Sequence, residues 1–411
     1  MSKRQQVALI FMCWALYTSA YLGRYSFNSN ILPIETAYGF TSAESGLVGS
    51  MFFFAYGAGQ IINGILCKYY NVKYVLSLSM IISAIINAVV FFGVLPPVYL
   101  KFLWLINGFS QSFLWSSLIM TLSRNLDEHY IKKAIFAMST TASIGTFLSY
   151  GLSALLATSN AFIYSFFVAS VLMAIMGILW FILCSKITDK NAVVIVNQTD
   201  GQLKSKKMDN SVVKVLVLFG LFAIIVNLMK DGLTTWVPKV LKTNFNMPDS
   251  FSILLTLILP VLVVFGTSFV MTLNKKIKDY KLLMAVLFVI SSVFMTIVVL
   301  LLSSSAWYVV LVSFGLTTLC MGGANNIITS ILPLSLRDKA NSGFLSGILN
   351  GCCYVGSTIS SFGLGALFDF YQGWSPIFII LLILCVSVVV LAVGTALGER
   401  ILSKKKKHID G

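Results

Sequence analysis

Twelve apolar segments follow one another along this chain, separated by polar connections, and this pattern limits the fold more than any other feature. A helix that crosses a bilayer needs about 20 mostly apolar residues, because the hydrocarbon core is roughly 30 Å thick. Backbone polar groups inside that core must be paired within the protein, which a helix achieves on its own. The sequence therefore predicts an all-α membrane protein, with spans at approximately 7–34, 43–66, 74–94, 99–122, 132–157, 161–184, 212–240, 251–273, 281–302, 306–333, 340–368 and 374–397.

The composition supports this class and argues against others. Hydrophobic residues make up 58% of the 411 positions and charged residues 10%, whereas soluble proteins carry about 25% charged residues. The seven cysteines form no metal-ligand pattern. The two histidines, His129 and His408, are not near a plausible nucleophile, and no phosphate-binding loop motif is present. We therefore expect neither an enzyme nor a cofactor, and no direct use of ATP.

The basic residues sort to one side of the predicted membrane. If the N-terminus is cytoplasmic, 24 of the 29 lysines and arginines fall in cytoplasmic segments. This asymmetry is the one that orients multi-pass proteins, so both termini are expected on the cytoplasmic side of the plasma membrane. It also accounts for the net charge of +15 without a nucleic-acid partner. The expected partners are the lipid bilayer and a small anionic substrate, and the protein is expected to be monomeric.

The chain divides into two similar halves. One long polar stretch separates the first six spans from the last six, and Lys68 after the second span corresponds to Lys275 after the eighth. Two six-helix bundles related by a parallel repeat are the layout of the major facilitator fold. The expected parts are an N-terminal bundle (1–184), a cytoplasmic linker (185–211), a C-terminal bundle (212–397) and a basic cytoplasmic tail (398–411).

One cation lies within an apolar segment of each half. Arg24 lies in the first span, nine residues before Pro33, and Lys230 lies in the seventh span, eight residues before Pro238. A charge inside the membrane is costly and usually faces a water-filled pathway or a partner. Two cations at matching points of a repeat therefore predict one anion-binding site between the halves.

Several short motifs resemble one family of transporters. They are Tyr21-Leu22-Gly23-Arg24-Tyr25-Ser26-Phe27 through Pro33, Ala55-Tyr56-Gly57, Asn107-Gly108-Phe109-Ser110-Gln111 with Trp115, Lys230-Asp231-Gly232 with Trp236 and Pro238, and Gly365 and Asp369 before Gly373-Trp374. These residues resemble the organophosphate:phosphate antiporters of the major facilitator superfamily, which include glycerol-3-phosphate and hexose-phosphate transporters. The resemblance implies exchange of a phosphate ester for phosphate by alternating access, with one cation from each half clamping the phosphate.

The chain also departs from that family. Lys230 stands where the family has an arginine, so the second cation is a point charge rather than a planar fork. Gln60 and Ala142 stand where the family has a lysine and a histidine, and Tyr25 stands where a basic residue often follows the first arginine. The site is therefore less positive than in the phosphate exchangers. This leaves open a proton-coupled transporter of an organic carboxylate or zwitterion.

A transporter-like ligand sensor is the alternative of another class. A sensor is expected to carry a large cytoplasmic extension, and neither the linker nor the tail is long enough to suggest one. The sequence therefore favours transport over sensing.

The candidate site residues are polar or aromatic and lie within the predicted spans. Tyr21, Arg24 and Asn28 share one face of a helix. Asp231 is the one carboxylate deep in a predicted span. It either neutralises a nearby cation or carries a coupling proton. If it neutralises a cation, the carrier could change between its inward-open and outward-open states without substrate. The candidate substrate-binding set is Arg24, Lys230, Tyr21, Tyr25, Asn28, Gln60, Gln111, Trp115, Asn227, Asn326 and Tyr354, with Asp231 for coupling or charge balance.

Overall fold

Every regular element in the described part of the chain is a helix. The structure, a computed structural model, describes residues 2–66, 69–93, 95–158, 161–187, 209–336 and 342–409. The first half contains α1 (Lys3–Tyr25), η1 (Asn28–Asn30), α2 (Ile31–Tyr38), α3 (Ser42–Leu66), α4 (Val72–Phe92), α5 (Pro97–Asn125), α6 (Glu128–Ala157) and α7 (Tyr164–Ile187). The second contains α8 (Asn210–Phe245), α9 (Asp249–Thr256), α10 (Ile258–Lys276), α11 (Tyr280–Leu301), α12 (Trp307–Asn326), η3 (Ile327–Ile331), α13 (Leu332–Ser335), α14 (Ser342–Tyr371) and α15 (Ser375–Ile409).

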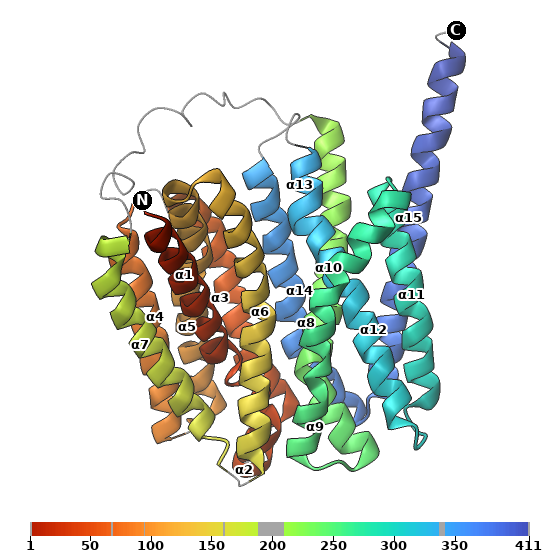
Figure 1. Ribbon diagram of the computed structural model, residues 1–411. Helices are drawn as coiled ribbons and strands as arrows, with labels where there is room; N and C mark the ends of the chain where they lie inside the picture. Colours follow the sequence, from red (N-terminus) through yellow and green to blue (C-terminus); the bar gives the residue numbers. More distant parts are fainter. Residues whose placement is uncertain are drawn as a thin grey trace.

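The two halves stand side by side, with α1–α7 on one side and α8–α15 on the other (Figure 1). The start of α1 and the end of α15 lie at the same end of the bundle, which we call the termini face. α2 and α9 lie at the opposite end, which we call the distal face (Figure 1). This arrangement agrees with an even number of membrane crossings.

Each predicted span corresponds to one helix or to one interrupted helix. In the described ranges, 10 helical segments are long and apolar enough to cross a membrane. The two other predicted spans are α5 and α6, with 29 and 30 residues, which are long enough but more polar. Their polar residues include buried Asn107 and Gln111 of α5, which point away from lipid. The all-α membrane prediction is confirmed.

The parts between and after the bundles are described only in part. The predicted linker falls between α7 and α8, but its residues 188–208 lie outside the described residues, as does Lys68 of the first basic loop. The predicted last span, 374–397, agrees with the apolar segment Ser375–Glu399, and α15 continues beyond it without a break to Ile409. Most of the predicted tail is therefore helical, because nothing in its sequence interrupts a helix.

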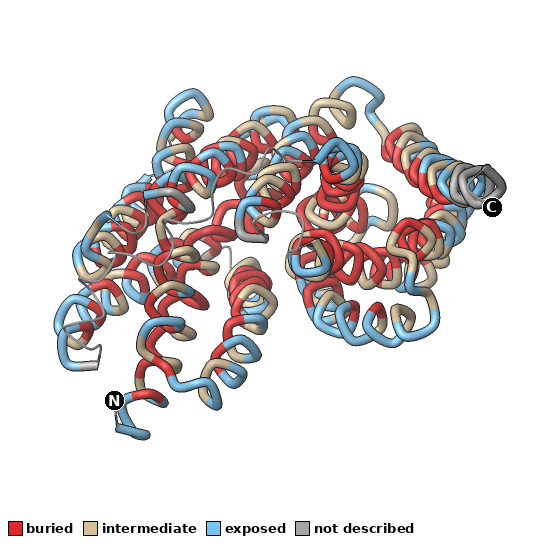
Figure 2. The backbone as a smooth tube through the Cα atoms, turned by 90° about the horizontal axis from the view of Figure 1, so that it is seen from above, coloured by how far each residue is buried: buried red, intermediate tan, exposed pale blue. Residues whose placement is uncertain are grey.

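Burial is greatest where helices face one another (Figure 2). The exposed positions include many large apolar side chains. Phe92 and Phe136, for example, are 85% and 73% exposed. Exposed apolar surface on this scale marks contact with lipid rather than water. The structure therefore agrees with a multi-pass membrane protein.

The hydrophobic core joins the two halves. One cluster, including Leu16, Met80 and Trp180, lies wholly within the first half. A larger cluster runs through the second half and includes first-half residues such as Phe27 and Trp104. Its first-half residues reach as far as Tyr56 in the middle of α3. The two halves thus share a core that extends from the distal face to the middle of the bundle.

Candidate anion-binding site

Arg24 lies where the first membrane helix breaks. α1 ends at Tyr25 and α2 resumes at Ile31. Pro33 explains the interruption, because proline has no N–H for the carbonyl four residues earlier and its ring clashes with that carbonyl. Neighbouring helices hold the turn that carries Arg24: the amides of Asn87 and Asn107 donate to the Gly23 carbonyl at 3.4 and 3.2 Å. The position of the guanidinium is therefore set by α4 and α5 as well as by α1.

The Arg24 guanidinium is buried, with 4% of the residue exposed. Its Nε donates to Gln111 Oε1 at 3.5 Å, and its Nη2 has no hydrogen-bond partner. Its Cζ lies 4.3 Å from the ring centre of Tyr21 and 4.2 Å from that of Tyr56. Among the described residues, no carboxylate lies within ion-pairing distance of Arg24. Aromatic rings thus stabilise the cation, and one of its donor groups remains available.

Lys230 has a different environment. Its Nζ donates to Asn227 Oδ1 at 2.9 Å and lies 3.4 Å from Asp231 Oδ1. The side chains of Lys230 and Asp231 are 19% and 12% exposed. The second oxygen of Asp231 accepts a hydrogen bond from Ser357 of α14. The two cations predicted as equivalents therefore differ, since Lys230 has its own carboxylate and Arg24 has none.

The proline in the second half does not break its helix. α8 runs continuously from Asn210 to Phe245, with Pro238 inside it. Pro238 leaves the carbonyl of Thr234 without its helical donor. The hydroxyl of Tyr150, from α6 of the other half, donates to that carbonyl at 2.9 Å. A side chain from the first half thus satisfies a backbone group that the helix leaves free.

Most of the remaining candidates lie near Arg24 or Lys230. Tyr21 stacks on Tyr25 with ring centres 6.0 Å apart, and the Asn28 amide donates to Thr235 across the halves at 3.3 Å. Tyr354 of α14 lies 4.8 Å, ring centre to ring centre, from Tyr56. These contacts bring Tyr21, Tyr25, Gln111 and Tyr354 into the surroundings of Arg24, and Asn227 into those of Lys230.

Three candidates have other contacts. Gln60 donates to the Ser112 carbonyl at 3.2 Å, within the first half. Trp115 lies behind Tyr17, with ring centres 5.1 Å apart. Asn325, rather than Asn326, accepts from Asn227 at 2.9 Å. Their roles in binding stay predictions.

Two tyrosines beside Arg24 were absent from the predicted set. The hydroxyls of Tyr17 and Tyr56 lie 2.9 Å apart, and the Tyr17 ring centre is 5.9 Å from Arg24 Cζ. Helical spacing could have identified Tyr17, because Tyr17, Tyr21 and Arg24 follow one another at four and three residues and share a face. Tyr56 lies on a different helix, so no local spacing links it to Arg24.

A cluster of charges links the halves at the distal face. Lys239 of α8 pairs with Glu35 of α2 at 2.5 Å and also donates to Ser42 Oγ. The Asp369 carboxylate of α14 accepts from the backbone N–H groups of Ser42 and Ala43 at 3.2 and 2.7 Å. These groups open α3, so the carboxylate lies at the positive end of that helix. We call Glu35, Ser42, Lys239 and Asp369 the distal latch.

All inter-half hydrogen bonds recorded for the described residues lie on the distal side of Arg24 and Lys230. Besides the latch, they join Asn28 to Thr235, Tyr150 to Thr234, Thr36 to Lys242 and Gly46 to Ser361. The halves are therefore fastened at the distal face.

Asp369→Asn is expected to loosen this closure. A carboxylate at a helix N-terminus contributes about 0.3–1 kcal/mol, and up to about 2 kcal/mol when partly buried. We expect faster modification of a cysteine introduced at Thr235 by a membrane-impermeant maleimide added from the distal side. Glu44→Gln is the matched control, since Glu44 accepts from Thr41 N–H at the start of the same helix, within its own half. Equal acceleration in both variants would contradict a role for Asp369 between the halves.

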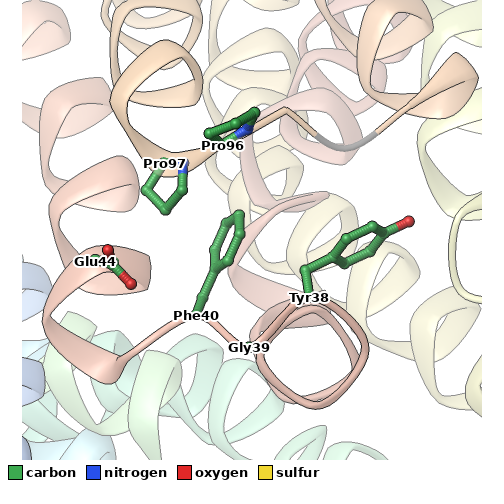
Figure 3. A pocket seen from close by; sticks show the side chains of 6 residues that line it. All are labelled: Tyr38, Gly39, Phe40, Glu44, Pro96 and Pro97. Atoms are coloured by element: carbon green, nitrogen blue, oxygen red, sulfur yellow. The ribbon is translucent and has the colours of Figure 1, made fainter.

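A separate pocket opens near the distal face. It is lined by Tyr38, Gly39, Phe40, Glu44, Pro96 and Pro97, and the Phe40 ring points toward the two prolines (Figure 3). All six residues belong to the first half, and none is a cation. This pocket is therefore distinct from the region between Arg24 and Lys230.

Several curated relatives have names related to phosphate esters. The chain is 25% identical over 189 residues to a probable hexose phosphate transport protein of Chlamydia trachomatis serovar D, and 26% identical over 114 residues to its namesake in Chlamydia pneumoniae. It is also 26% identical over 106 residues to membrane sensor protein UhpC of Salmonella typhimurium. These alignments cover 46%, 28% and 26% of this chain. The chain spans 40%, 25% and 24% of the relatives' lengths. The predicted resemblance is confirmed at this low level of identity.

Solved structures share the fold. The nucleoside transporter NupG matches with a TM-score of 0.72 and 14% identity, over 95% of this chain and 98% of that chain. A bacterial homolog to the human lysosomal transporter Spinster, in an inward-facing and unoccupied conformation, matches with a TM-score of 0.70 and 12% identity, over 96% of each chain. At such identities the likeness shows the fold alone.

The family follows from the sequence as a whole. The model described as Major Facilitator Superfamily matches residues 13–361, far more than half of the chain. Proteins of this superfamily are transporters built from two six-helix halves, which agrees with the helices described above and confirms that the chain is not an enzyme. The chain belongs to the Major Facilitator Superfamily.

Proposed function

We propose that this protein is a secondary transporter of small organic anions, with phosphate monoesters as the favoured class and inorganic phosphate as the exchanged anion. The carrying observation is Arg24, which is buried, has no carboxylate partner among the described residues and keeps Nη2 without an acceptor. A buried donor without a partner is costly, and a buried charge more so. An anion from solution that reaches the guanidinium would relieve both costs.

The chemistry of the pair suits a phosphate group. A guanidinium can make two parallel hydrogen bonds to phosphate or carboxylate oxygens, and a lysine ammonium adds a point charge. Arg24 comes from the first half and Lys230 from the second, so an anion bound to both would link the halves. The formal charges of Arg24, Lys230 and Asp231 sum to +1 (+1 +1 −1). This sum suits the monoanion of a phosphate ester and leaves a carboxylate as the competing ligand.

Alternating access supplies the transport step. The halves are fastened at the distal face, so the described state is closed there, and transport requires a second state in which these contacts open. The excess of basic residues on that side supports a cytoplasmic location for both termini, at the plasma membrane. Substrate drives the cycle only if it binds the closed and open arrangements with different affinities. An anion held by one cation from each half meets that condition.

Exchange in proteoliposomes tests the proposal. Vesicles carrying the protein are loaded with radiolabelled phosphate and diluted into sugar phosphates, glycerol phosphate, carboxylates or zwitterions in turn. Release of label stimulated by a phosphate ester, and absent from protein-free vesicles, is the expected result. No release of phosphate with any ester, together with uptake of a radiolabelled carboxylate that requires an imposed pH gradient, would replace this function with proton-coupled carboxylate transport.

A second candidate function is ligand sensing. The similarity to membrane sensor protein UhpC favours it, because that relative is named as a sensor rather than a carrier. A transporter moves its ligand across the membrane, whereas a sensor binds the ligand without moving it. A phosphate ester that raises the thermal stability of the purified protein but moves no label in either direction would favour the sensor.

A further inference from the structure

We infer that Asp231 acts as an internal counter-anion for Lys230, so that the empty carrier can reorient and exchange is not obligatory. The inference rests on the proposed function and adds a second activity, net flux of the anion without a counter-substrate. It concerns which charges remain uncompensated when no substrate is bound.

The charges of the two cations are compensated in different ways. Lys230 Nζ lies 3.4 Å from Asp231 Oδ1, and both side chains are largely withdrawn from solvent. Arg24 has no such partner among the described residues and is surrounded instead by the rings of Tyr21 and Tyr56, with Phe52 at 5.2 Å. The empty site therefore holds one paired cation and one cation stabilised by aromatic faces.

Compensation matters most during reorientation. Between its two open arrangements a carrier passes through a state in which the site is closed to water from both sides. A buried cation without a partner is strongly unfavourable in such a state, whereas a paired cation is far less so. Two uncompensated cations would confine reorientation to loaded carriers, which is obligatory exchange. Asp231 reduces the number of uncompensated cations from two to one.

Other contacts keep Asp231 available for this role. Ser357 of α14 donates to the Asp231 oxygen that faces away from Lys230. Asn227 binds Lys230 through its oxygen and Asn325 through its amide, at 2.9 Å each. The carboxylate is thus anchored from a second helix and does not depend on Lys230 alone. A phosphate that reaches Lys230 can replace Asp231 as its partner without leaving the carboxylate free of hydrogen bonds.

Adjacent position alone does not explain the pairing. Neighbouring residues of a helix point about 100° apart, so an ion pair between them forms only if a long side chain bends toward its neighbour. Lys230 does so here although Asn227 already accepts from its ammonium. Asp231 thus lies within ion-pairing distance of Lys230 while Asn227 holds the ammonium.

The test compares two fluxes in the same vesicles, using inorganic phosphate as the probe. Vesicles loaded with radiolabelled phosphate are diluted into buffer with phosphate (exchange) or without it (net efflux), with potassium and valinomycin clamping the membrane potential. The wild-type protein is expected to show both fluxes. Asp231→Asn is expected to lower net efflux at least about tenfold more than it lowers exchange, a difference equivalent to about 1.4 kcal/mol.

Three further variants separate charge from structure. Asp231→Glu keeps the charge and is expected to keep net efflux. Ser357→Ala removes the anchoring hydrogen bond but no charge, so its ratio of net efflux to exchange should stay closer to wild type than that of Asp231→Asn. Glu399→Gln breaks a remote ion pair with Lys281 at the end of the same half and is expected to leave the ratio unchanged.

The possible outcomes are distinct. Wild-type efflux that strictly requires external phosphate would overturn the inference and leave the proposed function intact. An equal loss of both fluxes in Asp231→Asn would also overturn it, because it would assign Asp231 to binding or folding. Absence of phosphate flux under both conditions would overturn the proposed function and the inference together.

Discussion

Arg24→Gln is expected to abolish measurable anion exchange while leaving the protein folded. Removing one member of a buried hydrogen-bonded charge pair costs about 2–5 kcal/mol, which corresponds to a roughly 30-fold to several-thousand-fold loss of affinity. The folded protein is expected to tolerate the change, because Arg24 has no carboxylate that would be left unpaired among the described residues. The measurement is phosphate exchange in proteoliposomes, together with the thermal stability of the purified variant.

The chain offers a matched control for this substitution. Arg4 lies on the same helix, near its exposed start, so Arg4→Gln removes the same charge far from the site. Arg24→Lys keeps the charge but loses the planar pair of donors, and an intermediate loss is expected. Wild-type exchange by Arg24→Gln would exclude an anion site at this residue, whatever the variant's stability.

The fold could be predicted because it depends on local composition. A bilayer requires long apolar helices, so counting apolar segments located all twelve regions. The two less apolar segments, α5 and α6, could still be recognised from their length and from the polar residues that flank them. The continuation of α15 beyond the predicted span could not be predicted from hydropathy, since basic residues indicate a change of surroundings and do not by themselves end a helix.

The site could be predicted only in part. The repeat and the resemblance pointed to Arg24 and Lys230 as a matching pair of cations, and the sequence placed Asp231 next to Lys230. The contacts that hold Asp231 and Asn227 could not be predicted, because Ser357 and Asn325 are distant in sequence and belong to helices α14 and α12. Likewise, the two matching prolines differ in effect: α8 stays continuous through Pro238, and Tyr150 from the other half donates to the carbonyl that Pro238 leaves free.

The distal latch could not be predicted from local sequence. Its hydrogen-bonded residues Ser42 and Asp369 lie 327 positions apart, and each latch residue alone resembles an ordinary polar or charged residue at a helix end. Only the packing of α3 against α14 brings Asp369 to the first turn of α3. The same packing makes a glycine essential nearby.

Gly365→Ala is expected to prevent closure of the distal face. A Cβ at this position would overlap the backbone carbonyl oxygen of Ser42 and lie 2.7 Å from Trp236 Cζ2, and neither atom belongs to a flexible side chain. Forcing an extra methyl into close packing costs about 1–3 kcal/mol, a roughly 5-fold to 150-fold shift toward arrangements in which α3 and α14 separate. Transport should fall, because the carrier cannot complete the half of its cycle that requires distal closure. Cysteine accessibility at Thr235 from the distal side should rise.

Gly363→Ala is the control for the glycine substitution itself. Gly363 lies two residues earlier on α14, and a Cβ there would meet only Ile359 Cγ2 of the same helix, at 3.8 Å. This variant is expected to transport at the wild-type rate, and a cysteine introduced at Thr235 should be modified from the distal side as slowly as in the wild-type background. Gly46→Ala tests the contact between α3 and α14 from the α3 side. A Cβ at Gly46 would overlap the Ser361 carbonyl oxygen, so this variant should reproduce the effect of Gly365→Ala. If Gly365→Ala instead transported and labelled like Gly363→Ala, the close contact between α3 and α14 would not be part of the transport cycle.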